Sequence, residues 1–456
     1  MSLLAIATRC AVVAALCAGG VSAAGCGSTP STSGTSGATA PDGAVKTGPA
    51  AVRAAGRYTL EVLDSESYSP RTELMDRINE RFERAHPNIT VKRVTKAFQD
   101  YMSSVKLTLS GDNPACVAMG DQGRDVDGQL VRAGLLRPLD DYARAYDWPV
   151  DRTAQWSDGG DVWGEGETYS VSPFYNVIAL YYNKAILRRL GLAPPTTFDE
   201  FVRSLEKAKR AGMTPIALGN ADRTAAAMQY EAIQGQFVPK EQLTDFVFRS
   251  GDDPTFDHPG NLDAATLLRD WTKRGYFTEG YSGLTPQDAV TRFIKGRGLY
   301  HLTGPWYAGM IADGLGEDAG LMLLPPRNPG ASSVATGGLG GPWHITSGCD
   351  EPDVAAAYLD FLIGPEVARM VADAGELPSR PEPAPAGASP ILRQLFAARD
   401  ELQADDGIVP FIEVAYPGFA DSFYGALQEL MEGRVEPAAF VERIEQGYTD
   451  HFEAAG

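Results

Sequence analysis

Residues 180–202 read LYYNKAILRRLGLAPPTTFDEFV, which is the pattern of a strand followed by two helices. The apolar run at 177–182 is typical of a buried strand, and the short amphipathic segment after it ends at Gly191. Thr197 and Glu200 have the spacing of a capping box, so a longer second helix is predicted to begin here. A strand followed directly by helices favours an α/β fold.

The same alternation runs through the part of the chain that precedes this stretch. Residues 57–64 alternate apolar and polar side chains and predict a strand. Apolar side chains recur at helical spacing over 74–85, and Pro87 stops that helix. Further strands are predicted at 89–94 and 115–119. This order predicts an α/β layer with a largely parallel sheet.

Length and charge limit the possible functions. The chain has 456 residues, which is too long for one core and fits two or three domains. Its formal net charge of −19 disfavours nucleic acid and anionic lipid headgroups as partners. The five histidines are scattered without metal-ligand spacing, and no phosphate-binding or nucleophile motif is present. We therefore predict no metal, no cofactor and no enzymatic activity.

The N-terminus has the features of an export signal. Arg9 precedes an apolar run at 10–20, which is too short to span a bilayer, so residues 1–25 are predicted to be a signal peptide. Small residues lead up to Cys26 and resemble a lipobox, with Ala23 where Leu is usual. This predicts a lipid-anchored, palmitate-bearing protein at the outer face of the cell membrane. Ordinary signal cleavage, which leaves Cys26 as a free thiol, is the alternative.

Small and polar residues dominate the segment that follows. Residues 26–56 hold almost no large apolar side chain and are predicted to form a disordered leash between the lipid and the folded body. Beyond it, only Cys116 and Cys349 remain as cysteines, and outside the cytoplasm such a pair could be oxidised.

Four segments, in the same order, resemble the extracellular solute-binding proteins of carbohydrate ABC importers, the group that includes maltose-binding protein. They are FERAHPNITVKRV (82–94), the stretch at 180–202, FIKGRGLYHLTGPWYAGM (293–310) and GGLGGPWHITSGCDEPDVAAAYLDFLIGPE (337–366). The resemblance runs from about residue 57 to the C-terminus. It implies a two-lobed periplasmic-binding-protein-like fold of type II, with a ligand cleft between the lobes.

The resemblance also implies a division of the chain, a set of partners and a disulfide. One lobe is expected at 57–165 plus 334–378, and the other at 166–333 plus 379–456. A monomer is expected to capture a sugar or oligosaccharide and deliver it to the permease subunits of an ABC transporter. In the family, a return strand runs antiparallel beside the third strand, which implies that Cys116 and Cys349 are joined.

A sugar site needs aromatic faces for the C–H groups of the ring and polar side chains for its hydroxyls. By resemblance, Trp306 matches the stacking Trp of the family, and Trp343 lies in a segment that resembles a cleft-lining strand. Tyr416 lies where the family often places another aromatic. For both Trp residues, packing in the core is the alternative.

Polar candidates follow the predicted strands. Asp121 comes after the strand at 115–119, at the edge where open α/β sheets present ligands, although it could instead cap a helix. Glu66, Gln122 and Asn220 follow strands in the same way. Arg380 matches a family position near the ligand, with a solvated hinge Arg as the alternative.

Two other functions remain open from the sequence. A secreted glycosidase would need two carboxylates about 5–10 Å apart, and Asp121 and Glu66 are of the required type. A binding protein for a non-sugar would have a different lining: basic for a phosphate ester, acidic for a polyamine. A cleft lined mainly by Trp and Tyr would favour a sugar, whose identity and chain length the sequence leaves open.

Overall fold

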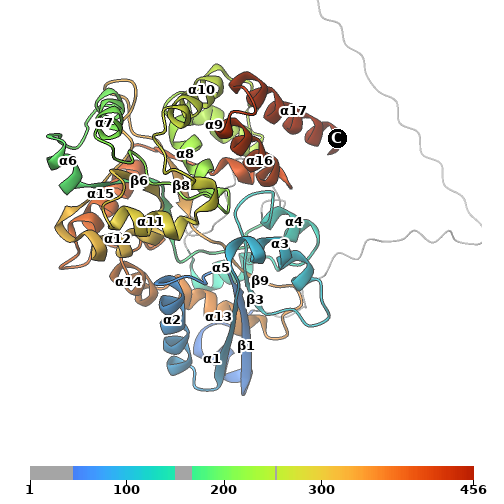
Figure 1. The fold of residues 1–456 in the computed structure, drawn as a ribbon. Helices are drawn as coiled ribbons and strands as arrows, with labels where there is room; N and C mark the ends of the chain where they lie inside the picture. Colours follow the sequence, from blue (N-terminus) through green and yellow to red (C-terminus); the bar gives the residue numbers. More distant parts are fainter. Residues whose placement is uncertain (1–44, 149–166, 252–253, 456) are drawn as a thin grey trace, which may run out of the picture. The chain divides into compact units, whose positions relative to one another are not determined.

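The computed structural model describes residues 45–148, 167–251 and 254–455 (Figure 1). The predicted signal peptide, Cys26 and the first part of the predicted leash lie outside these ranges, and the body from residue 45 onward is described by itself. Within it, no helix combines the length and apolarity needed to cross a membrane. The described residues also form no cluster of side chains suited to a metal ion.

The first sheet has the strand order β2-β1-β3-β9. Its strands are β1 (Tyr58–Asp64), β2 (Ile89–Thr95), β3 (Val117–Met119) and β9 (Trp343–Ile345). The central strand β1 is parallel to both neighbours, and β9 is antiparallel to β3. The predicted parallel sheet is therefore present, closed at one edge by a strand from late in the chain.

Two further sheets have the orders β10-β8-β4 and β6-β5-β7. Their strands are β4 (Tyr175–Val177), β5 (Ala179–Asn183), β6 (Tyr300–Thr303), β7 (Ala319–Met322), β8 (Ala335–Leu339) and β10 (Ile408–Val409). Strand β5 is antiparallel to both of its neighbours. Strand β8, which lies in the range 334–378 expected in the first lobe, pairs with β4 and β10. The lobe boundaries stay predictions.

Helices cover the sheets and supply most of the buried apolar surface. The α-helices are α1 (Gly48–Ala54), α2 (Arg71–Ala85), α3 (Phe98–Leu109), α4 (Asp127–Arg132), α5 (Asp140–Tyr146), α6 (Lys184–Arg189), α7 (Phe198–Arg210), α8 (Thr224–Gln234), α9 (Lys240–Phe248), α10 (Pro259–Lys273), α11 (Pro286–Ile294), α12 (Ala308–Leu315), α13 (Pro352–Leu362), α14 (Pro365–Asp373), α15 (Pro390–Ala404), α16 (Phe419–Glu432) and α17 (Pro437–Ala455). Short 3-10 helices are η2 (Tyr281–Gly283), η3 (Pro305–Tyr307), η4 (Gly316–Asp318) and η5 (Ile412–Val414).

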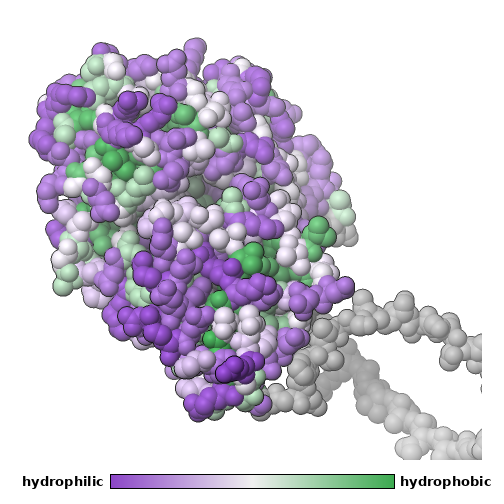
Figure 2. Space-filling view, turned by 60° about the horizontal axis from the view of Figure 1, so that its bottom comes forward, coloured by the Kyte–Doolittle hydropathy of each residue, from purple (hydrophilic) through white to green (hydrophobic). Residues whose placement is uncertain are grey.

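These helices fall into separate groups. Helices α1, α2 and α13 lie beside the first sheet, whereas α8, α10, α16 and α17 pack on one another elsewhere (Figure 1). Each group encloses its own apolar cluster, and a third cluster lies around β5, β7 and α15. In Figure 2, hydrophilic residues cover most of the visible face and apolar residues appear only in small groups.

The local signals at 180–202 produce the expected elements with one difference. The Asn183 side chain accepts from the Ile186 N–H and caps α6, and the Thr197 hydroxyl accepts from the Glu200 N–H and caps α7. The capping box is shifted, because the Glu200 carboxylate accepts from the N–H of Thr196 rather than of Thr197. Both helix starts were therefore predicted correctly.

Part of the predicted disordered leash is folded. Helix α1 lies inside the range 26–56 and buries Ala51 and Val52 beside α13. The Asn88 side-chain amide donates to the carbonyl of Val52 and holds the end of the helix. The composition of the segment could not support a core of its own, but two small apolar side chains suffice to dock a short helix on an existing surface.

A disulfide joins the first sheet to the segment that returns to it. Cys116 and Cys349 are bonded, with a Cα–Cα distance of 4.3 Å and a sequence separation of 233 residues. The register of β3 against β9, with Val117 opposite Ile345, brings the two thiols to the same edge. The bond closes a loop that contains most of the described chain.

Removing this crosslink should destabilise the protein. The double variant Cys116→Ala, Cys349→Ala is expected to lose about 2–5 kcal/mol of unfolding free energy, because the unfolded chain regains the freedom of a long loop. Urea unfolding with and without a reducing agent measures this. Reduction should weaken the parent protein and leave the double variant unchanged; equal midpoints for the variant and the oxidised parent would contradict the prediction.

Candidate functional site

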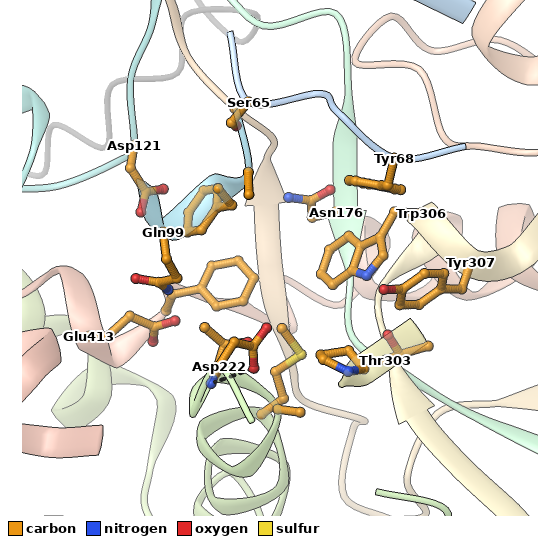
Figure 3. Close-up of a pocket in the computed structure, with 18 of the residues that line it drawn as sticks. Ser65, Tyr68, Gln99, Asp121, Asn176, Asp222, Thr303, Trp306, Tyr307 and Glu413 are labelled. Carbon is orange, nitrogen blue, oxygen red and sulfur yellow. Dashed lines mark hydrogen bonds between the residues drawn. The ribbon is translucent and has the colours of Figure 1, made fainter. Parts of the chain in front are cut away.

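A cavity of about 400 Å³ lies where the ends of several strands meet (Figure 3). Its wall comes from the segments after β1, β3 and β6, from the start of α3, and from α8 and η5. Such a volume is in the range of small-molecule sites. The aromatic residues of the lining are Tyr68, Phe98, Trp306, Tyr307, Phe411 and Tyr424, and its acidic residues are Glu66, Asp100, Asp121, Asp222 and Glu413.

One side of the cavity is aromatic. Trp306 and Tyr307 lie in η3 directly after β6, and the Tyr68 ring lies 6.1 Å from the Tyr307 ring between centroids (Figure 3). A Cβ at Gly304 would approach the Trp306 indole to 2.1 Å, so only glycine lets the indole lie over this stretch of backbone. Trp306 is half-buried and presents part of its ring to the cavity.

The opposite side is acidic. Asp121 follows β3, and its Oδ1 accepts from the N–H of Gln122 at 3.0 Å. Burial raises the pKa of Asp121 well above its ordinary value, and the nearby charges of Glu413 and Asp127 raise it further. Figure 3 shows Asp121 and Glu413 across the cavity from Trp306, with Asp222 below them.

Glu413, which is partly buried, lies beside a second carboxyl group that is fully buried. Glu231 in α8 is 3% exposed, and its Oε1 accepts from the Ile412 N–H at 2.9 Å. Burial, and then the charge of Glu413, raise the pKa of Glu231 well above its ordinary value. The environment of Glu231 therefore favours its protonated form. The Oε1 of Glu413 accepts from the Tyr424 hydroxyl at 3.3 Å.

Arg71, the first residue of α2, is the basic side chain of the lining and is fully paired. Its Nη1 donates to Glu66 at 2.9 Å and its Nη2 to Glu376 at 2.6 Å. Its guanidinium also lies 3.9 Å from the centre of the Phe174 ring. Burial raises the pKa of Glu66 to about 7, although the charge of Arg71 acts in the opposite direction. This ion pair ties the segment after β1 to the segment after α14.

Two further polar groups of the lining carry acceptor atoms without a partner. His301 in β6 is 5% exposed, and its Nδ1 is 2.9 Å from the carbonyl oxygen of Ala217. Burial lowers the pKa of His301 to about 4, so the ring is neutral, Nδ1 donates and Nε2 is an acceptor. Among the described residues, neither His301 Nε2 nor the buried Oδ1 of Asn176 has a hydrogen-bond partner.

The cavity brings together half of the residues that we singled out from the sequence as ligand contacts. Those that line it are Glu66, Asp121, Gln122 and Trp306. Each follows the end of a strand, and the carboxyl ends of the parallel strands β1 and β3 meet at this edge of the sheet.

The other four candidates do not line the cavity. Trp343 is fully buried in β9 within the core of the first sheet, and Tyr416 stacks on His451 among the aromatic rings around α17. Asn220 uses its Oδ1 to accept from the N–H of Ala226 near the start of α8. Arg380 forms an ion pair with Glu382 at 3.6 Å. Each of these four side chains packs or pairs outside the cavity, and their role as ligand contacts stays a prediction.

Several residues that line the cavity were not predicted from the sequence. Tyr307 is adjacent to Trp306, and Asp222 lies two residues after Asn220, so proximity to a chosen residue was the available signal. Tyr68, Asn176 and His301 carried no such signal, because their places in the wall depend on how distant segments pack.

A model of the family described as bacterial extracellular solute-binding protein matches residues 78–391. The melibiose/raffinose/stachyose-binding protein MelE of Bacillus subtilis is 25% identical over 293 residues, 59% of this chain and 63% of that protein. A probable sugar-binding periplasmic protein of Mesorhizobium japonicum is 32% identical over 146 residues, 30% of this chain and 31% of that protein. Both alignments span less than two thirds of the relative.

Solved structures match over more of the chain. A chitin oligosaccharide binding protein has a TM-score of 0.75 at 20% identity, with 86% of this chain and 98% of that chain covered. RafE in complex with raffinose has a TM-score of 0.68 at 20% identity and the same coverage. These likenesses confirm the predicted α/β fold of the type II periplasmic-binding-protein class.

Replacing Arg71 should leave two buried carboxyl groups without their cation. Arg71→Met is expected to lower the unfolding free energy by about 3–5 kcal/mol at pH 7. Without Arg71, the pKa of Glu66 in the folded state rises further above its unfolded value, so the loss should shrink as the pH falls from 7 towards 5.

Urea unfolding of the parent and the variant at both pH values measures this difference. The matched control is Arg81→Met, which breaks an exposed Arg–Glu pair with Glu366 and should cost less than about 1 kcal/mol. Equal losses for the two variants at pH 7 would show that the Arg71 pair has no special role in stability.

Proposed function

This chain belongs to the bacterial extracellular solute-binding proteins, and we propose that it captures a sugar or an oligosaccharide in the cavity beside Trp306. The observation that supports this most strongly is the pairing of an aromatic wall with a polar wall across about 400 Å³. A sugar stacks its C–H face on an aromatic ring and directs its hydroxyls to carboxylates and amides. The sugar-binding names of MelE and RafE's raffinose complex support the same assignment.

The residues proposed to hold the ligand are those that line the cavity. The Trp306 ring stacks on one face of the sugar, while Asp121 and Gln122 hydrogen-bond its hydroxyls. Both carboxylate oxygens of Glu66 accept from Arg71, so Glu66 contacts the ligand only through the lone pairs that remain on them. Because the matched relatives are named as binding proteins, we propose no catalytic role for these carboxylates.

Delivery to a membrane permease completes the proposal. Ligand binding favours a closed arrangement of two lobes, and the permease of an ABC importer recognises that form. The protein acts as a monomer outside the cytoplasm, tethered to the membrane by a lipid on Cys26 after removal of residues 1–25. Family membership supports the extracellular location, and the tether rests on the sequence around Cys26.

Trp306 provides a direct test of the proposed site. A thermal-shift screen against a panel of mono- and oligosaccharides identifies a ligand through the stabilisation that it produces. Calorimetry with that ligand should show Trp306→Ala binding about 10- to 100-fold more weakly, because a stacking face worth about 1.4–2.7 kcal/mol is lost.

Trp306→Phe is the matched control, since it keeps a flat ring and should retain most of the affinity. Both variants should unfold close to the parent temperature, because Trp306 is half-buried. Unchanged affinity in a folded Trp306→Ala would remove this residue from the site, and a panel without any ligand would contradict the sugar assignment.

The lipid tether has a separate test. Growth with a labelled fatty acid should label the parent protein and leave Cys26→Ser unlabelled, because the thiol of Cys26 is the proposed attachment point. Membrane fractionation should show the variant released. Labelling that persists in Cys26→Ser would place the lipid elsewhere, and a parent that is never labelled would indicate a secreted, unanchored protein.

A further inference from the structure

Negative charge dominates the cavity beyond what a neutral sugar requires. Five acidic side chains line it, against the basic side chain of Arg71. Arg71 pairs with both Glu66 and Glu376, so its single positive charge cannot offset the charge of two carboxylates. A neutral sugar needs hydroxyl partners but no net charge, so this excess calls for an explanation.

Of these five acidic side chains, only Glu66 forms an ion pair with a residue that the structure describes. Glu66 is paired with Arg71, Asp100 is exposed, and Glu413 already accepts from the Tyr424 hydroxyl. Asp121 and Asp222 remain, and neither forms an ion pair with any residue that the structure describes. Arg223, next to Asp222 in the chain, instead pairs with Asp421 at 3.7 Å. Asp121 and Asp222 are therefore partly buried carboxyl groups that accept from the backbone N–H groups of Gln122 and Thr224 but form no ion pair within the described part of the chain.

Independent of these acids, the lining presents buried acceptors that lack donors. His301 is 95% buried (5% exposed), lines the cavity, and has Nε2 free of any described partner while Nδ1–H is used by Ala217. The Oδ1 of Asn176, also in the lining, is likewise unpaired among the described residues. Buried acceptors without donors are unfavourable, so a bound molecule that donates to them is favoured.

An ammonium group matches this lining better than a hydroxyl does. It has three donors and no acceptor, and its positive charge can pair with Asp121 and Asp222, which form no ion pair among the described residues. A hydroxyl can donate to His301 but leaves the two carboxylates uncompensated. A phosphate ester would be repelled by the acidic wall. The aromatic wall at Trp306 and Tyr307 still requires a ring with an apolar face.

We propose that the ligand of this cavity is an amino-bearing saccharide, with its ring stacked on Trp306 and its protonated amine held by Asp121 and Asp222. This inference rests on the proposed function and names the chemical class of the ligand within it. In Figure 3, Asp121 lies across the cavity from Trp306 and Asp222 lies at the bottom of the view, so a sugar unit stacked on the indole can direct its amine away from the ring.

Matched sets of saccharides test the charge directly. Calorimetry on the full chain near pH 7 compares glucose with glucosamine, galactose with galactosamine, and the β-1,4-linked disaccharides of glucose, N-acetylglucosamine and glucosamine. In at least one set, the free amine is expected to bind about 10-fold or more tightly than its hydroxyl or N-acetyl counterpart, because only the free amine is charged. Spermidine serves as a cation without a ring.

Variants of the two aspartates then test whether they cause the preference for the amine. Asp121→Asn and Asp222→Asn should each lower the affinity for the preferred amine about 10-fold, and change that for its neutral counterpart by less than about 3-fold. Asp263→Asn is the matched control, since it removes the same charge from an exposed position on α10 and should change neither affinity. Unfolding temperatures establish that each variant is folded.

The outcomes separate this inference from the function on which it rests. If every hydroxyl sugar binds as tightly as the amino sugar of its set, the proposed amine preference is wrong, while the sugar-binding function stands. Binding of spermidine with no saccharide bound overturns both. An amine preference that persists in both folded aspartate variants overturns the assignment to Asp121 and Asp222.

Discussion

The antiparallel pairing of β9 with β3 is the constraint on which the arrangement of the body depends. It joins segments far apart in the sequence, and the bond between Cys116 and Cys349 secures it at one edge. For β9 to reach this position, the chain must leave the first sheet and return to it. The segments that make these passages therefore lie together, as the pairing of Val171 with Trp343 shows. The carboxyl ends of β1 and β3 are left open beside these passages, and the cavity forms there.

The buried ion pair of Arg71 follows from the same arrangement. Glu66 comes from the end of β1, Glu376 from the chain after α14, and Phe174 from a passage between sheets, and Arg71 contacts all three. Removing three charges from water is unfavourable, and close pairing offsets that cost. We infer that the pair sets the geometry of the wall more than it adds stability. It also engages the basic side chain of the lining, which leaves the rest of the cavity acidic.

The two sides of the cavity have different physical origins. The aromatic side is local, since η3 directly after β6 supplies Trp306 and Tyr307, and Gly304 makes room for the indole. The acidic side is assembled from the segment after β3, the segment before α8, and η5. Burial and the charge of Glu413 raise the pKa of Asp121, and that of Glu231 behind the wall. Such a wall is costly to bury without a cation, which links its electrostatics to the chemistry of a ligand.

The sequence by itself determined the alternation of strands and helices, the caps of α6 and α7, and the polar residues that end β1 and β3. These features depend on neighbours within a few residues, and the carboxyl ends of parallel strands must share an edge. Only the tertiary structure decided which aromatic side chains face the cavity. Trp343 and Tyr416 are aromatic like Trp306, yet strand pairing and helix packing bury them in the apolar cores. The docking of α1 and the places of Tyr68, Asp222 and His301 depend likewise on distant segments, because burial is settled by what packs against a residue.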